Sequence, residues 1–189
     1  MMKLTVTILI ALMVVIMPGT AGYGEGANVL VAYFSCTGNT RSAAVQIAGA
    51  LNVTPYEIVP ETLYTSADLN YRDNSSRASL EKDDPSSRPA ISGTVGNMEK
   101  YDIVFLGYPI WWGQAPRIIC TFMESYDFSG KTIIPFCTSG SSGIGSSATV
   151  LRGLCADSAN WLPGANLNGA SGNDAVKWIN GLGLDVIAE

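Results

Sequence analysis

The sequence predicts an α/β protein with a doubly wound, five-stranded parallel sheet and helices on both faces. Short apolar runs rich in β-branched and aromatic residues alternate with stretches of helical periodicity. The runs over 28–34, 101–107 and 131–137 are almost continuously apolar, as expected for strands buried on both faces. A content of 47% hydrophobic and 14% charged residues suits a single core, and 22–189 is expected to form one domain after a leader.

The elements follow in order along the chain. After the strand over 28–34, a helix is expected to begin near 40, with one apolar face. The run over 53–59 predicts a second strand, and Pro55 favours an edge position because proline lacks an N–H. The remaining regular elements are strands over 101–107, 131–137 and 159–162, and helices over 115–126, 146–154 and 171–182.

The segment 60–100 differs from the rest because it is polar and carries many of the charged residues. A long irregular connection inside a domain is usually functional or flexible. We expect at most short helices in it, near 65–70 and 76–82.

The N-terminus has the three regions of a signal peptide. Lys3 gives a positive start, 4–17 carry no charge, and small residues precede an expected cut after Ala21. We expect 1–21 to be removed and the protein to be exported, extracytoplasmic or at the cell surface, with no stable membrane insertion afterwards. An uncleaved anchor is the alternative. Cleavage removes one positive charge, so the net charge of −5 becomes −6.

The charge, histidine and cysteine content of the chain argue against several classes of function. The net charge of −5 argues against nucleic-acid binding, and the chain has no His, the commonest acid/base residue and zinc ligand. The four cysteines show no metal-ligand spacing, so we expect no metal site and mostly buried thiols, although an exported protein could oxidise a pair. Redox chemistry would then come from a bound cofactor, and no catalytic side chain is assigned.

The first of three candidate binding loops follows the first strand. Hydroxyls, an amide and a glycine open a helix there, which is typical of a phosphate cradle; an ordinary capped turn is the alternative. The loop resembles the S/T-x-T-G-N-T phosphate signature of the flavodoxin family, whose members bind FMN. The residues concerned are Ser35, Cys36, Thr37, Gly38, Asn39 and Thr40.

The second loop follows the strand over 101–107 and contains two adjacent tryptophans. One of the pair is expected to leave the core, where an indole can stack on a flat ring; packing of both indoles under 60–100 is the alternative. The loop resembles the one beside the flavin ring in flavodoxins, and its double-Trp form is similar to a subgroup from anaerobic microbes. It comprises Pro109, Ile110, Trp111, Trp112 and Gly113.

The third loop follows the strand over 131–137 and is rich in serine and glycine. It is similar to the T-S-G-x-S-G loop of the same subgroup, which borders the pyrimidine edge of the flavin; a flexible polar loop is the alternative. Classical flavodoxins commonly place a stacking aromatic here, and this loop has none. Its residues are Thr138, Ser139, Gly140, Ser141, Ser142 and Gly143.

The resemblance implies strand order 2-1-3-4-5 and an FMN ring between the second and third loops. It implies an electron-transfer protein that meets redox partner proteins transiently. An FMN-dependent oxidoreductase that passes electrons from NAD(P)H to a quinone or other small-molecule acceptor is the alternative. A non-redox binding module on the same fold is a third possibility.

Overall fold

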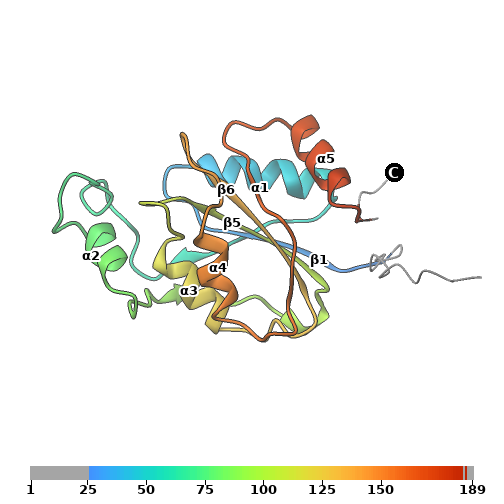
Figure 1. Ribbon diagram of the computed structural model, residues 1–189, viewed down its shortest axis with the longest axis horizontal. Coiled ribbons are helices and arrows are strands. Elements are labelled where there is room, and N and C mark those ends of the chain that lie inside the picture. The colour runs from blue at the N-terminus through green and yellow to red at the C-terminus, as the bar shows by residue number, and fades with distance from the viewer. Residues whose placement is uncertain (1–25, 185, 187–189) are drawn as a thin grey trace, which may run out of the picture.

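The computed structural model describes residues 26–184 and 186. Its main sheet is parallel and has the order β2-β1-β5-β6-β7, which confirms the predicted order 2-1-3-4-5 (Figure 1). The strands are β1 (Val29–Tyr33), β2 (Tyr56–Glu57), β5 (Ile103–Pro109), β6 (Thr132–Thr138) and β7 (Asn160–Trp161).

Helices cover both faces of this sheet, as predicted (Figure 1). α1 (Asn39–Ala50) and α5 (Gly172–Gly181) lie on one face, and α3 (Arg117–Glu124) and α4 (Ser147–Arg152) lie on the other. Each face has its own buried cluster of apolar side chains, because β1, β5 and β6 point alternate residues to opposite sides. The central strands β5 and β6 are buried except at Pro109, the last residue of β5, which explains their continuous apolar sequence.

The predicted strand over 159–162 is β7, and a second short strand follows it at the same edge of the sheet. β7 pairs with the start of β6, and β8 (Ala165–Asn166) pairs with its end. Between these pairings β6 carries Pro135, which has no N–H to offer its neighbour. Gly164 passes so close that an added Cβ would lie 2.4 Å from the carbonyl oxygen of Pro135. A missing donor and a close backbone approach therefore interrupt the edge of the sheet here.

The segment 60–100 is an ordered insert between β2 and β5. The predicted helix near 76–82 is α2 (Arg77–Asp83), and Ser76 is its N-cap. β3 (Val59–Pro60) and β4 (Ile91–Ser92) pair antiparallel at the base of the insert, a two-stranded sheet that the sequence analysis did not anticipate. A short 3₁₀ helix, η1 (Met98–Lys100), leads into β5.

Two expectations about this region need correction. The helix predicted near 65–70 is wrong: Thr65 and Asp68 form a single closed turn, after which the Asn70 side chain accepts the N–H of Arg72 and ends it. Of the strand predicted over 53–59, only Tyr56–Glu57 pairs with β1, at the sheet edge as expected. The predicted leader, 1–21, lies outside the described residues. Within them, no helix has the length and apolar character needed to cross a membrane.

Candidate functional site

The loop between β1 and α1 folds around Ser35. Its Oγ accepts a hydrogen bond from the Gly38 N–H at 3.1 Å, and Gly38 has a φ of 88°, which glycine adopts without steric cost. Gly38 is the N-cap of α1, and no side chain caps this helix. The N–H groups of its first turn therefore lack a side-chain acceptor. Together with the helix dipole, they favour an anion at this position.

The side chains of this loop are neutral hydrogen-bonding groups. Thr37 and Asn39 are exposed, and neither side chain has a hydrogen-bond partner within the described chain. The nearby cation is engaged elsewhere: Arg41 Nη2 lies 2.5 Å from Glu57 Oε1, and Arg41 Nε donates to the Tyr33 hydroxyl at 3.3 Å. The loop thus presents backbone and hydroxyl donors to an anion rather than a free positive charge.

Cys36 packs against the hydrophobic core at the variable position of the loop. Burial raises the pKa of its thiol to about 12, so the thiol stays protonated near neutral pH and is a poor nucleophile. All four cysteines are free thiols, two of them fully buried. Among the residues that the structure describes, no group of three His, Cys, Asp or Glu side chains is placed to hold a metal ion.

The second loop makes a tight two-residue turn. Trp111 and Gln114 exchange backbone hydrogen bonds of 2.9 Å in both directions. The two residues between them have positive φ angles, 47° for Trp112 and 76° for Gly113, as in a type I′ turn. Asparagine and glycine dominate such turns, and a bulky residue with positive φ is strained. Backbone strain at Trp112 thus coincides with the predicted ring-binding position.

The two tryptophans have different environments, as the sequence predicted for such a pair. Trp111 is half-buried and lies edge-on to Phe34 and Tyr64, with ring centroids 5.7 and 5.5 Å away. Trp112 is 40% exposed, and the Lys82 ammonium lies 5.3 Å from its ring centroid. Trp111 therefore supports the loop from the core, and Trp112 presents an indole at the surface.

A pocket of about 400 Å³ lies at the carboxyl ends of β1 and β5, where the first two loops meet. Its volume is in the usual range for small-molecule sites. Three residues of the insert complete the wall. The lining residues are Ser35, Cys36, Thr37, Thr40, Pro109, Ile110, Trp111, Trp112, Leu69, Tyr71 and Ala78. Of the predicted residues in the first two loops, Gly38, Asn39 and Gly113 do not line it.

The third loop lies beside the pocket, and none of 138–143 lines it. Thr138 nevertheless joins this loop to the first one, because its hydroxyl bonds that of Thr40. Ser139 Oγ accepts the N–H groups of Ser141 and Ser142. The Asn166 side-chain amide donates to the carbonyls of Ser139 and Ser142 at 3.1 and 2.8 Å. The loop is therefore held by specific bonds, and β8 supplies one of its supports.

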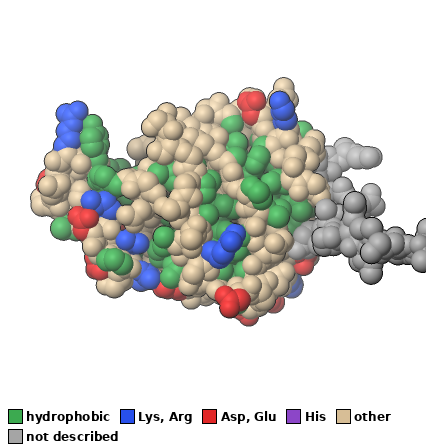
Figure 2. Space-filling model, viewed as in Figure 1, with side chains coloured by type: hydrophobic (Ala, Val, Ile, Leu, Met, Phe, Trp, Pro, Cys, Tyr) green, Lys and Arg blue, Asp and Glu red, His purple; other side chains and the backbone are tan. Residues whose placement is uncertain are grey.

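The insert residues on the pocket wall were missed in the sequence analysis. Leu69 and Tyr71 stand out in a polar segment, but exposed apolar residues are common and give no direction. Figure 2 shows apolar and basic side chains side by side on the projection formed by this part of the insert, at the left of the view. The insert brings these groups to the ends of the strands.

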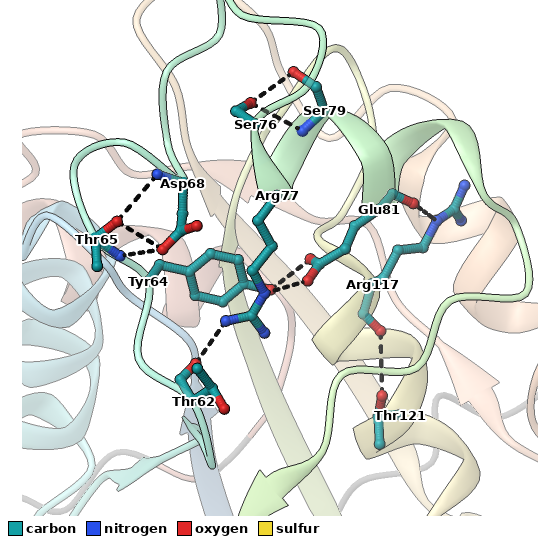
Figure 3. Close-up of polar contacts among 10 residues, drawn as sticks. All are labelled: Thr62, Tyr64, Thr65, Asp68, Ser76, Arg77, Ser79, Glu81, Arg117 and Thr121. Atoms are coloured by element: carbon teal, nitrogen blue, oxygen red, sulfur yellow. Dashed lines mark hydrogen bonds and ion pairs between the residues drawn. The ribbon is translucent and has the colours of Figure 1, made fainter.

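Three side chains of the insert form a polar cluster (Figure 3). The Tyr64 hydroxyl donates to Glu81 Oε2 at 2.6 Å, and Arg77 Nε donates to Glu81 Oε1 at 2.6 Å. The Arg77 guanidinium carbon lies 3.9 Å from the Tyr64 ring centroid. Burial, and then the bond to Glu81, raise the pKa of Tyr64 well above its ordinary value. Because Tyr64 also contacts Trp111, this cluster links the insert to the second loop.

A second anchor comes from the body of the protein. Arg117, a buried residue in the first turn of α3, donates to the backbone carbonyls of Glu81 and Lys82 at 3.1 and 3.0 Å. These carbonyls lie at the C-terminal end of α2, where a helix carries unpaired acceptors and partial negative charge (Figure 3). Arg117 thereby fixes α2 to α3.

Comparison with known proteins agrees with this architecture. The flavodoxin family model named Flavodoxin_4 matches residues 28–182. Crystal structures of two proteins provisionally assigned as flavoproteins are similar to the chain. The one from Bacteroides eggerthii is 46% identical, with a TM-score of 0.78 over 83% of this chain and 98% of the other. The one from Bacteroides uniformis is 49% identical, with a TM-score of 0.78 over 82% and 99%.

A more distant similarity concerns the fold alone. A flavoprotein from Lactobacillus acidophilus, solved in complex with FMN, is 19% identical, with a TM-score of 0.58 over 81% of this chain and 99% of the other. The sequence matches no curated protein. The family match spans the whole sheet and all three loops, and the chain therefore belongs to the flavodoxin family.

Proposed function

We propose that the chain binds FMN in this pocket and acts as an electron-transfer protein. One observation carries the proposal: the uncapped N-terminus of α1 and the exposed indole of Trp112 meet around a single pocket. A phosphate suits the first feature and a flat aromatic ring suits the second. The Lactobacillus acidophilus relative binds FMN, which supports the same choice here.

Each loop has a part in this proposal. The N–H groups at the start of α1 and the hydroxyls of Ser35 and Thr37 hold the phosphate. Trp112 covers the ring, and the Gly113 peptide is free to reorient because glycine tolerates both signs of φ. The Ser/Gly loop after β6 offers small donors to the polar edge of the ring. When bound, FMN supplies the redox chemistry.

The electron-transfer role implies transient contact with redox partner proteins. An acidic protein of net charge −5 suits partners that present basic patches. An FMN-dependent oxidoreductase acting on a quinone or another small acceptor is the second candidate. The insert favours it, since its side chains add a wall to the pocket beyond the strand-end loops. The double tryptophan also suggests placement in the double-Trp subgroup.

A spectroscopic and kinetic experiment tests the proposal. The purified protein, mixed with FMN and desalted, should keep a yellow chromophore in stoichiometric amount. Oxidation of NADPH with a quinone acceptor then separates the two redox roles, because a carrier turns over slowly without its partner. A protein that binds no flavin would contradict FMN binding and leave a non-redox module on this fold.

We also propose export with removal of 1–21. Expression of the full chain in a secreting host, followed by N-terminal sequencing of the extracytoplasmic product, should find Gly22 first. Retention of Met1 in a membrane fraction would instead identify an uncleaved anchor.

A further inference from the structure

Two large aromatic side chains that line the pocket are exposed to solvent. Tyr71, at the tip of the insert, is 64% exposed, and Trp112, in the turn after β5, is 40% exposed. They come from two segments that are distant in the sequence, the insert and the turn after β5, and both line the pocket. A planar ligand between these segments would remove apolar surface of both rings from water, which is favourable.

The third loop cannot provide this second ring. Residues 138–143 contain no aromatic side chain, and none of them lines the pocket. The insert provides Tyr71 at the pocket wall instead, together with Leu69. The aromatic contact that is missing from the third loop is therefore available from a different part of the chain.

The Tyr71 side chain contacts the guanidinium group of Arg72. Arg72 Nε donates to the Tyr71 hydroxyl at 3.2 Å, and its guanidinium carbon lies 5.4 Å from the ring centroid. No carboxylate in the described residues pairs with Arg72, whereas Lys82, over Trp112, also pairs with Asp83 at 2.9 Å. Arg72 thus both restrains the tyrosine and brings an uncompensated positive charge to the pocket edge.

The part of the insert around Tyr71, residues 70–75, is held in place by its own hydrogen bonds without a ligand. The Asn70 side chain accepts the N–H of Arg72 at 3.2 Å, and the Asp73 carboxylate accepts the N–H and hydroxyl of Ser75 at 2.8 and 2.6 Å. The Tyr64–Arg77–Glu81 cluster holds the base. A wall that is already in place costs less entropy when a ligand binds.

We propose that Tyr71 is a cofactor-binding residue that covers the planar ring from the insert side, and that Arg72 positions it. This inference rests on the proposed FMN binding. It also gives the insert a function in the redox site: the Arg72 charge favours the negative charge that the ring system gains on reduction.

Affinities for FMN and riboflavin, measured by fluorescence titration, test the proposal. Tyr71→Ala should weaken both ligands equally, by about threefold to tenfold, because the lost contact is with the ring. Tyr71→Phe should retain most of the affinity. Leu63→Ala is the matched control, since Leu63 is an exposed apolar residue of the same insert that does not line this pocket.

Arg72→Gln should lower both affinities slightly and move the midpoint potential to a more negative value, with a shift that shrinks as salt rises. If Tyr71→Ala behaves like Leu63→Ala while the wild-type protein binds FMN, the inference is wrong and FMN binding stands. An unchanged potential in Arg72→Gln would remove Arg72 from the proposal. If the wild-type protein binds neither ligand, FMN binding itself fails, and this inference fails with it.

Discussion

The hydroxyl oxygens of Thr40 and Thr138 lie 2.8 Å apart and join two loops that are 98 residues apart in the sequence. Both residues are buried, at 1% and 4% exposure. Thr40 lies in the first turn of α1 beside the proposed phosphate position, and Thr138 ends β6 where the Ser/Gly loop starts. The bond therefore sets the spacing between the first and third loops before any ligand binds.

Removing one partner of this pair should destabilise the fold. Thr138→Val leaves the buried Thr40 hydroxyl without its partner, which should lower the free energy of unfolding by about 1–3 kcal/mol. The double variant Thr40→Val/Thr138→Val should cost less than the sum of the single variants, because no hydroxyl is then left unpaired. Urea denaturation of the four proteins measures this coupling. Strictly additive losses would show that the two hydroxyls do not depend on each other.

Thr37 offers a cleaner test of the phosphate position, because its exposed side chain has no partner in the described chain. Thr37→Val should lower FMN affinity on the order of tenfold, the cost of one bond to a charged group, and leave riboflavin affinity and stability unchanged. Thr149→Val, at an exposed position of α4, is the control. Equal losses for FMN and riboflavin would argue against a phosphate at this loop.

The sheet and the loops at its edge were predictable because they depend on local patterns. Continuous apolar runs identify β1, β5 and β6, and the glycine at 38 and hydroxyls around it identify the start of α1. Parallel strands place their carboxyl ends at one edge, so the pattern also predicts that these loops lie near each other.

The remaining features depend on contacts between distant residues. The division of β7 from β8 follows from the close approach of Gly164 to Pro135, next to the Phe136–Ala165 pair, which no local pattern encodes. Tyr71 reaches the pocket only because Arg117 and the Tyr64 cluster anchor an insert whose own sequence is polar. The turn over 65–70 has the start of a helix, but one closed turn does not propagate without further stabilisation.

The aromatic packing of Trp111 predicts a loss of stability on truncation. Trp111→Ala removes edge-on contacts with Phe34 and Tyr64 and should lower the free energy of unfolding by about 2 kcal/mol, below the usual cost for a fully buried tryptophan. Urea denaturation checks this value. A loss within the error of the measurement would mean that the Phe34–Tyr64 pair closes the gap without the indole.

Replacing Trp112, in contrast to Trp111, should lower FMN affinity without lowering the stability of the fold. Trp112→Asn places a residue that tolerates positive φ in the turn, so the free energy of unfolding should stay constant or rise by up to about 1 kcal/mol. FMN affinity should fall by about 1 kcal/mol with the loss of the indole. Gly113→Ala, which adds strain at a φ of 76°, should destabilise the protein by about 1 kcal/mol. A large loss of stability in Trp112→Asn would indicate that the indole has a packing role.

Tyr64 should make the insert sensitive to alkaline pH. Burial and the bond to Glu81 raise its pKa above the ordinary value of 10.0, so the folded protein keeps a proton that the unfolded chain loses above that pH. The resulting stabilisation is complete below pH 10 and is lost as the pH rises beyond it, at up to about 1.4 kcal/mol per pH unit.

Tyr64→Phe should lower the free energy of unfolding by about 1 kcal/mol at pH 7, through the lost bond to Glu81, and should show a shallower decline in stability above pH 10. Urea denaturation between pH 7 and about pH 11 measures both curves. Tyr71→Phe, which removes the hydroxyl of an exposed tyrosine in the same insert, serves as the control for loss of a tyrosine elsewhere. If the wild-type and Tyr64→Phe curves run parallel across this range, Tyr64 does not hold its proton in the folded state.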